Sequence, residues 1–74
     1  MMIVKINNDE VVRVDQIIRE DCYIRGYIHG KKTVVFEFYF NDDFDKAKEA
    51  MAALTENLRN SNFVDINSIY YQFK

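Results

Sequence analysis

The chain has 74 residues, a formal net charge of −2, and a composition that is 49% hydrophobic and 15% aromatic. This apolar content excludes an intrinsically disordered protein, and the acidic charge argues against nucleic acid as a partner. The longest apolar runs, such as Met1 to Val4, are too short for a membrane span or a signal-peptide core. We therefore expect a cytoplasmic protein with no membrane contact.

A single domain covering residues 1–74 is expected, because the chain has no proline, only two glycines and no low-complexity stretch to mark a linker. A domain of this size hides only about 60% of the surface that its unfolded chain exposes. The lone Cys22 cannot form an internal disulfide, and the lone His29 leaves no credible zinc site. We therefore expect a homodimer or larger homo-oligomer to supply stability that the core lacks.

The first elements in chain order form a predicted β-hairpin. Met2 to Ile6 is rich in β-branched residues, residues 7–9 are turn-forming Asn-Asn-Asp, and Val11 to Val14 resumes the apolar pattern. After this hairpin, Ile17 and Ile18 fit either a further short strand or a bend. The sequence leaves these two alternatives open.

A second hairpin carries the clearest alternation in the chain, with strands predicted over Cys22 to Ile28 and Thr33 to Phe40. The turn at residues 29–32 is expected to place Gly30 in the left-handed conformation with an adjacent bulge, so that even-numbered positions share a face. The shared apolar face comprises Cys22, Ile24, Ile28, Val34, Phe36, Phe38 and Phe40. The opposite face comprises Tyr23, Arg25, Tyr27, Val35, Glu37 and Tyr39.

An amphipathic helix is predicted from Phe44 to Arg59. The preceding Asn-Asp-Asp at 41–43 supplies N-cap oxygens. Its apolar stripe recurs at spacings of three and four and consists of Phe44, Ala47, Met51, Leu54 and Leu58.

The tail from Phe63 to Phe73 is predicted to be a bent final strand, because it is rich in β-branched and aromatic residues. A helical period through Phe63, Ile66, Tyr70 and Phe73 is the alternative. The whole pattern indicates an α+β fold, a small and mostly antiparallel sheet of four to five strands packed on one helix, in the order ββββαβ or βββαβ.

No residue set in the sequence has the arrangement of a catalytic centre. His29 is a turn residue without a nucleophile beside it, and Cys22 falls on the predicted apolar face, where core packing explains it. The acidic residues 42, 43 and 45 lack a calcium-loop pattern and are explained by helix capping. We therefore expect a protein that is not an enzyme and that uses no cofactor or metal.

The candidate functional surface is the second face of the hairpin sheet, since tyrosine and arginine are enriched at protein interfaces. The predicted interface residues are Tyr23, Arg25, Tyr27, Val35, Glu37 and Tyr39. The first hypothesis is a protein-interaction or assembly module; its small size and acidity also suit a phage or mobile-element inhibitor of a host protein. The alternative hypothesis is that the same face binds a small ligand, nucleotide or single-stranded nucleic acid, with Arg25, Lys31 and Lys32 contacting phosphate. Cross-strand aromatic packing without a binding role is the third explanation.

Overall fold

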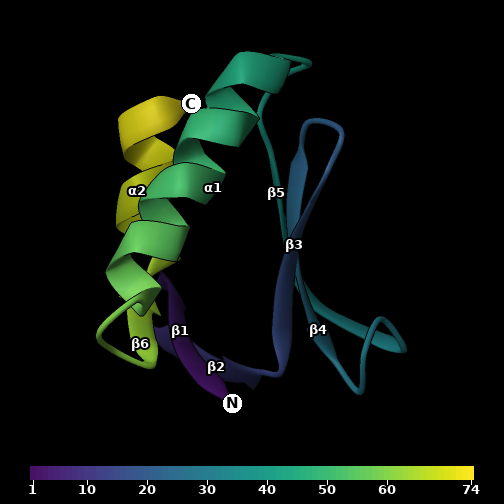
Figure 1. The fold of residues 1–74 in the computed structure, drawn as a ribbon, viewed down its shortest axis with the longest axis vertical. Coiled ribbons are helices and arrows are strands. Elements are labelled where there is room, and N and C mark those ends of the chain that lie inside the picture. Colours follow the sequence, from purple (N-terminus) through teal and green to yellow (C-terminus); the bar gives the residue numbers. More distant parts are fainter.

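Two three-stranded sheets and two helices make up the fold in the computed structural model, which describes residues 1–74 (Figure 1). In chain order the elements are β1 (Met2–Asn7), β2 (Glu10–Val14), β3 (Gln16–Glu20), β4 (Tyr23–Ile28), β5 (Thr33–Tyr39), α1 (Phe44–Leu58), β6 (Phe63–Asp65) and α2 (Ile66–Phe73). The α+β class is as predicted. Neither helix is long and apolar enough to cross a membrane.

The predicted single sheet of four to five strands was wrong, because the chain changes sheet at Asp15. One sheet has the order β2-β1-β6 and the other β3-β4-β5. The backbone N–H of Asp15 donates to the Tyr27 carbonyl over 2.9 Å, and the Asp15 carboxylate accepts the N–H of His29 over 3.1 Å. These bonds fix the corner that separates Val14 in the first sheet from Gln16 in the second. The segment around Ile17 and Ile18 is therefore a strand.

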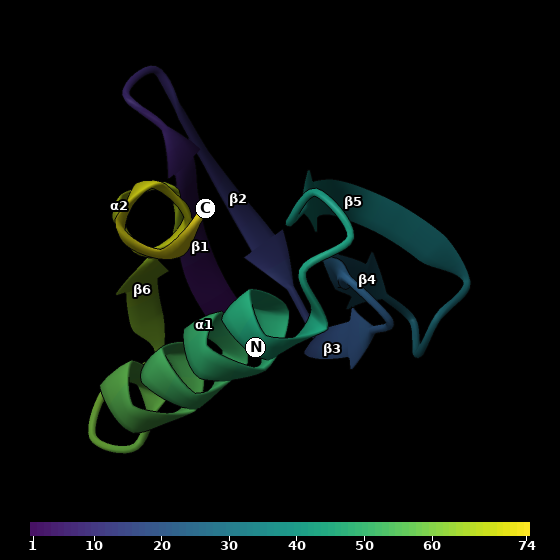
Figure 2. The same ribbon diagram turned by 90° about the horizontal axis from the view of Figure 1, so that it is seen from above.

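Both sheets and both helices contribute side chains to one hydrophobic core. Figure 2 shows the arrangement of these elements as seen from above. Eleven buried residues form the core: Val4, Val14, Ile24, Phe36, Phe40, Ala47, Ala50, Leu54, Val64, Ile66 and Ile69. Both helices and every strand other than β3 contribute to the core, so no element supplies it alone. Only 13 of the 74 residues are buried, which agrees with the limited burial expected of so short a chain.

The helix α1 begins and ends within one residue of its prediction. The Asp43 carboxylate accepts the N–H of Lys46 over 3.1 Å, as expected of an N-cap. Ala47 and Leu54 of the predicted apolar stripe are buried, as expected for the side of the helix that faces the core, but Phe44 is 44% exposed. The guanidinium of Arg19 lies 4.5 Å from the Phe44 ring centre, so a cation–π contact covers this residue instead.

The predicted bent strand at the tail was wrong beyond Asp65. Only β6 is a strand, and it pairs parallel to β1, with Ile3 opposite Phe63. The Asp65 carboxylate then accepts the N–H of Ser68 over 3.0 Å and caps α2, which buries Ile66 and Ile69. Burial of these two side chains against the core favours the helical alternative over a further strand.

The β4–β5 turn combines a confirmed prediction with a correction. Gly30 has the predicted left-handed conformation, but so do His29 and Lys31, with φ values of 59° and 73°. The predicted bulge lies inside β5 rather than at the turn, since Gly26 pairs with Phe36 and the next residue of β4 pairs with Val34. One residue of β5, at position 35, is left unpaired by this shift.

The left-handed conformation of Lys31 predicts a stabilising substitution in this turn. An L-residue pays a steric cost there that glycine does not, so Lys31→Gly is expected to raise the free energy of unfolding by up to about 1 kcal/mol. Lys32→Gly is the matched control, because Lys32 has no positive φ. Glycine there relieves no strain and only increases the conformational freedom of the unfolded chain. Urea denaturation of both variants measures the difference; equal destabilisation would contradict the argument.

Gly26 is required by the close approach of the Phe36 ring. A Cβ atom added at Gly26 would lie 2.7 Å from two carbons of that ring, closer than real contacts allow, and nearer still to a third. The ring covers the glycine within the core-facing side of the sheet, where Phe36 is only 6% exposed. The space is therefore filled by an aromatic side chain from the neighbouring strand.

Gly26→Ala is expected to lower the free energy of unfolding by about 1–3 kcal/mol, the usual cost of overpacking a core. In a Phe36→Ala background the same change should cost much less, because the obstructing ring is absent. Chemical denaturation of the four proteins in this double-mutant cycle measures the coupling. Additive effects would show that the ring is not the cause.

Candidate functional site

The predicted interface residues are brought together on the face of the β3-β4-β5 sheet that is turned away from the core, with one exception. Tyr23 pairs with Tyr39 and Arg25 with Glu37, so these four side chains occupy adjacent positions on two strands. We call this surface the tyrosine face; it also includes Tyr27 and, from β3, Glu20. The bulge removes Val35, which packs against the core, and places Val34 opposite Tyr27.

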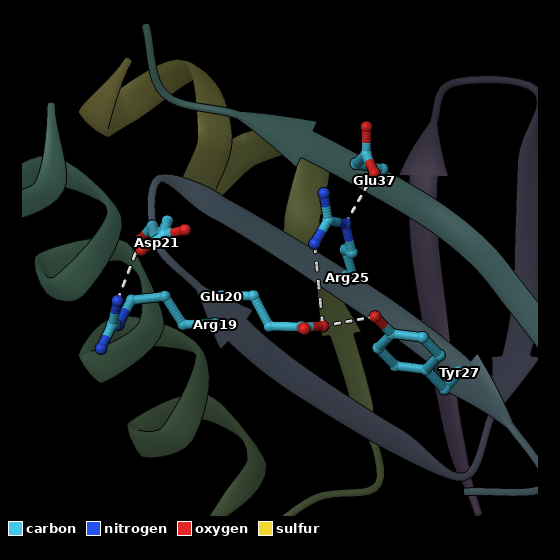
Figure 3. A network of polar contacts seen from close by, with 6 residues as sticks. All are labelled: Arg19, Glu20, Asp21, Arg25, Tyr27 and Glu37. Atoms are coloured by element: carbon cyan, nitrogen blue, oxygen red, sulfur yellow. Dashed lines mark hydrogen bonds and ion pairs between the residues drawn. The ribbon is translucent and has the colours of Figure 1, made fainter. Parts of the chain in front are cut away.

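Arg25 is the centre of a polar network on the tyrosine face (Figure 3). Its Nε donates to Oε2 of Glu37 over 2.6 Å, and a terminal nitrogen lies 3.8 Å from Oε1 of Glu20. Its guanidinium also stacks 4.2 Å from the centre of the Tyr23 ring. Hydrogen bonding to Glu37 raises the pKa of Arg25 further. The guanidinium is held in one place by two carboxylates and an aromatic ring.

Tyr27 supports this network through a hydrogen bond and does not offer a surface for a partner to contact. Its hydroxyl donates a hydrogen bond to the Glu20 carboxylate, which lowers the pKa of Glu20 and raises the pKa of Tyr27. The whole residue is only 6% exposed. Tyr27 therefore helps to fix Glu20, and through it Arg25, while remaining unavailable to a large partner.

Tyr23 and Tyr39 form the half-buried aromatic part of the face. Their ring centres are 4.8 Å apart and their planes are tilted by 32°. Hydrogen bonding to the Asp42 carboxylate, together with burial, raises the pKa of Tyr39 to about 12. The Arg25 guanidinium stacks on the Tyr23 ring, and the Asp42 carboxylate is close enough to the Tyr39 hydroxyl to raise its pKa. The pair is consequently ordered before any partner arrives.

The remaining candidates for chemistry are scattered. His29 is exposed in the β4–β5 turn, at the opposite end of β4 from Cys22. Burial and the nearby carboxylate of Asp42 raise the pKa of the Cys22 thiol, which disfavours the nucleophilic thiolate. The structure has no detectable pocket and no group of three or more side chains placed to hold a metal ion.

Glu20 and Asp42 are the site residues that sequence reasoning missed. Glu20 belongs to β3, which the sequence left undecided between strand and bend. Had β3 been recognised, the alternation of positions 16, 18 and 20 would have indicated that Glu20 lies on one face with Ile18. Asp42 was explained by helix capping alone. Asp42 lies in a turn in which both Asn41 and Asp42 have positive φ, a conformation that local sequence does not specify.

No protein-family model, curated protein or solved structure matches the chain. The fold and the site define a small α+β protein with two three-stranded sheets, one of which exposes a fixed cluster of tyrosine, arginine and carboxylate side chains.

The contact with Asp42 predicts the titration of Tyr39. Asp42→Asn is expected to lower the pKa of Tyr39 from about 12 toward the ordinary 10.0. Because the pKa is raised in the folded state, its stabilising contribution is complete below pH 10 and is lost as the pH rises toward 12. Ultraviolet titration of the phenolates tests this. Asp9→Asn, in the β1–β2 turn, serves as a control that should leave the titration unchanged.

Proposed function

We propose that the protein is a non-catalytic protein-interaction or assembly module and that the tyrosine face is its binding surface. The observation that carries the proposal is the ordered Tyr23–Tyr39 pair, with Arg25 stacked on one ring, on a sheet face that no helix covers. Tyrosine and arginine provide much of the binding energy at protein interfaces. Rigid aromatic rings also lose little conformational entropy when a partner binds.

Preorganisation supports a binding role over simple packing. Arg25 is only 24% exposed at its side chain and has three contacts that hold it on the sheet, to Glu20, Glu37 and Tyr23. A partner therefore meets a surface whose side chains are already ordered, which reduces the entropic cost of association. Along β4 and β5 the Arg25–Glu37 pair lies between the Tyr23–Tyr39 pair and Tyr27, so the face combines the tyrosine and arginine side chains that protein interfaces favour.

The charge of the face favours a protein over a phosphate-bearing ligand. Two carboxylates, Glu20 and Glu37, already pair with the single guanidinium of Arg25, and Asp42 adds a third carboxylate beside Tyr39. A nucleotide or single strand would meet net negative charge at the tyrosine pair, against the usual attraction of basic grooves for phosphate. Lys31 and Lys32 lie at the far turn of β4 and β5.

The partner within this proposal is a second protein or a further copy of the chain. The small size and acidity that suit a phage or mobile-element inhibitor remain the support for that narrower idea, and the tyrosine face adds a surface through which such a protein would block its target. We propose the cytoplasm as the location.

Substitution of the two half-buried tyrosines tests the proposed surface. Tyr23→Ser and Tyr39→Ser are expected to reduce affinity for a captured partner at least about tenfold, as removal of interface hot spots does. Tyr71→Ser is the matched control, since Tyr71 is 61% exposed but lies on α2. Affinity purification with each variant as bait identifies the partner, and titration calorimetry then measures the affinity.

Retention of the same partner by the Tyr23→Ser and Tyr39→Ser variants, with near-ultraviolet circular dichroism showing an intact fold, would contradict the proposal. Tyrosine fluorescence measured in the presence of oligothymidylate tests the alternative that the face binds single-stranded nucleic acid. A salt-dependent fluorescence change abolished by Arg25→Glu would instead establish the nucleic-acid alternative.

A further inference from the structure

The outer edge of β5 is open. β5 is the last strand of its sheet and pairs only with β4. The N–H of Phe40 donates to the Cys22 carbonyl over 2.9 Å, and alternate residues of an antiparallel strand bond the same neighbour. The backbone groups of Phe38 therefore face β4, and those of Glu37 and Tyr39 face away from it. Because β5 pairs with no strand but β4, these outward-facing N–H and C=O groups have no strand partner within the chain.

This edge lacks two of the features that protect edge strands from pairing, and Glu37 is its one charged side chain. β5 has the sequence Thr-Val-Val-Phe-Glu-Phe-Tyr, with no lysine and no proline. The bulge at Val35 interrupts only its first half, which leaves residues 36–39 regular. The opposite edge strand, β3, differs because it has two adjacent charged residues, Arg19 and Glu20. Residues 36–39 of β5 can therefore pair with a further β-strand.

We propose that the neighbour is β5 of a second copy, paired antiparallel about a twofold axis at Phe38. This register sets Glu37 of each copy opposite Tyr39 of the other, which forms four backbone hydrogen bonds from the groups that face the open edge. A register with its axis at Glu37 would oppose two carboxylates, which is destabilising. An axis at Phe36 would run the pairing through the bulge.

Pairing in this register joins two three-stranded sheets into one continuous six-stranded sheet. The tyrosine faces of the two copies become neighbours, with both Tyr39 residues near the axis, so the dimer presents a doubled aromatic surface. Additional burial at the junction offsets the small core of the single chain, in which 13 of 74 residues are buried. The inference rests on the proposed assembly role, but it uses the strand edge and not the tyrosine face.

Glu37→Pro removes an outward-facing N–H without removing a bond to β4, and edge strands tolerate proline for that reason. The matched control is Glu37→Ala, which loses the same carboxylate but keeps the N–H. Sedimentation equilibrium of the full chain is expected to give twice the 8.9 kDa mass of one chain for the wild type and Glu37→Ala. Glu37→Pro should give the single-chain mass, with an unchanged circular dichroism spectrum.

A single-chain mass for the wild type at concentrations up to about 1 mM would overturn the inference, because a dissociation constant above that concentration would mean a very weak association. Dimers of Glu37→Pro with undiminished affinity would also overturn it. The Tyr23→Ser and Tyr39→Ser variants keep every backbone group and should still dimerise. If these variants remain dimers but lose partner binding, both the tyrosine face as binding surface and the β5 edge pairing are supported. If the wild type is a monomer that still binds its partner, only the edge pairing is overturned.

Amide hydrogen exchange of the wild type tests the edge pairing even if Glu37→Pro fails to fold. The N–H groups of Glu37 and Tyr39 should be protected at high protein concentration and exchange at least about tenfold faster on dilution below the dissociation constant. The N–H of Phe38, which faces β4, should stay protected at both concentrations. Fast exchange at Glu37 and Tyr39 in the dimer would overturn the proposed pairing.

Discussion

The corner at Asp15 is the constraint on which the rest of the structure depends. Its two backbone-linked hydrogen bonds, to Tyr27 and His29, turn the chain from one sheet into the other within one residue. The two sheets then share a core with both helices. Since α1 and α2 are both used to cover that core, neither remains for the far side of the β3-β4-β5 sheet. The exposed tyrosine face is therefore a consequence of how the corner divides the strands.

The far side of that sheet remains ordered through polar and aromatic contacts in place of a covering element. Glu20 accepts from Tyr27 and lies beside Arg25, while Glu37 bonds the same guanidinium from the other strand. Each of the three strands contributes at least one member, so the network ties the sheet together across its width (Figure 3). Partly exposed ion pairs add little stability individually. Their effect here is to fix the positions of side chains that a partner would contact.

The bulge in β5 connects the fold to the proposed assembly. By leaving Val35 unpaired, it turns that side chain toward the core and places Val34, which is 53% exposed, opposite Tyr27. It also limits the regular open edge to the second half of the strand. Bulges often mark the margin of a pairing or binding segment. In this protein the bulge interrupts the edge of β5 near the β4–β5 turn. The other half of the strand, which contains Glu37 and Tyr39, remains regular.

The sequence by itself determined the local elements: the hairpin of β1 and β2, the helix capped by Asp43, and the shared face of Tyr23 and Arg25. Turn residues, capping and side-chain alternation act over a few residues, so a single segment contains the information. Only the tertiary structure decided the division into two sheets, the parallel pairing of β6 with β1, and the helical state of α2. These features depend on contacts between segments far apart in the chain, where burial of side chains such as Ile69 outweighs local strand propensity.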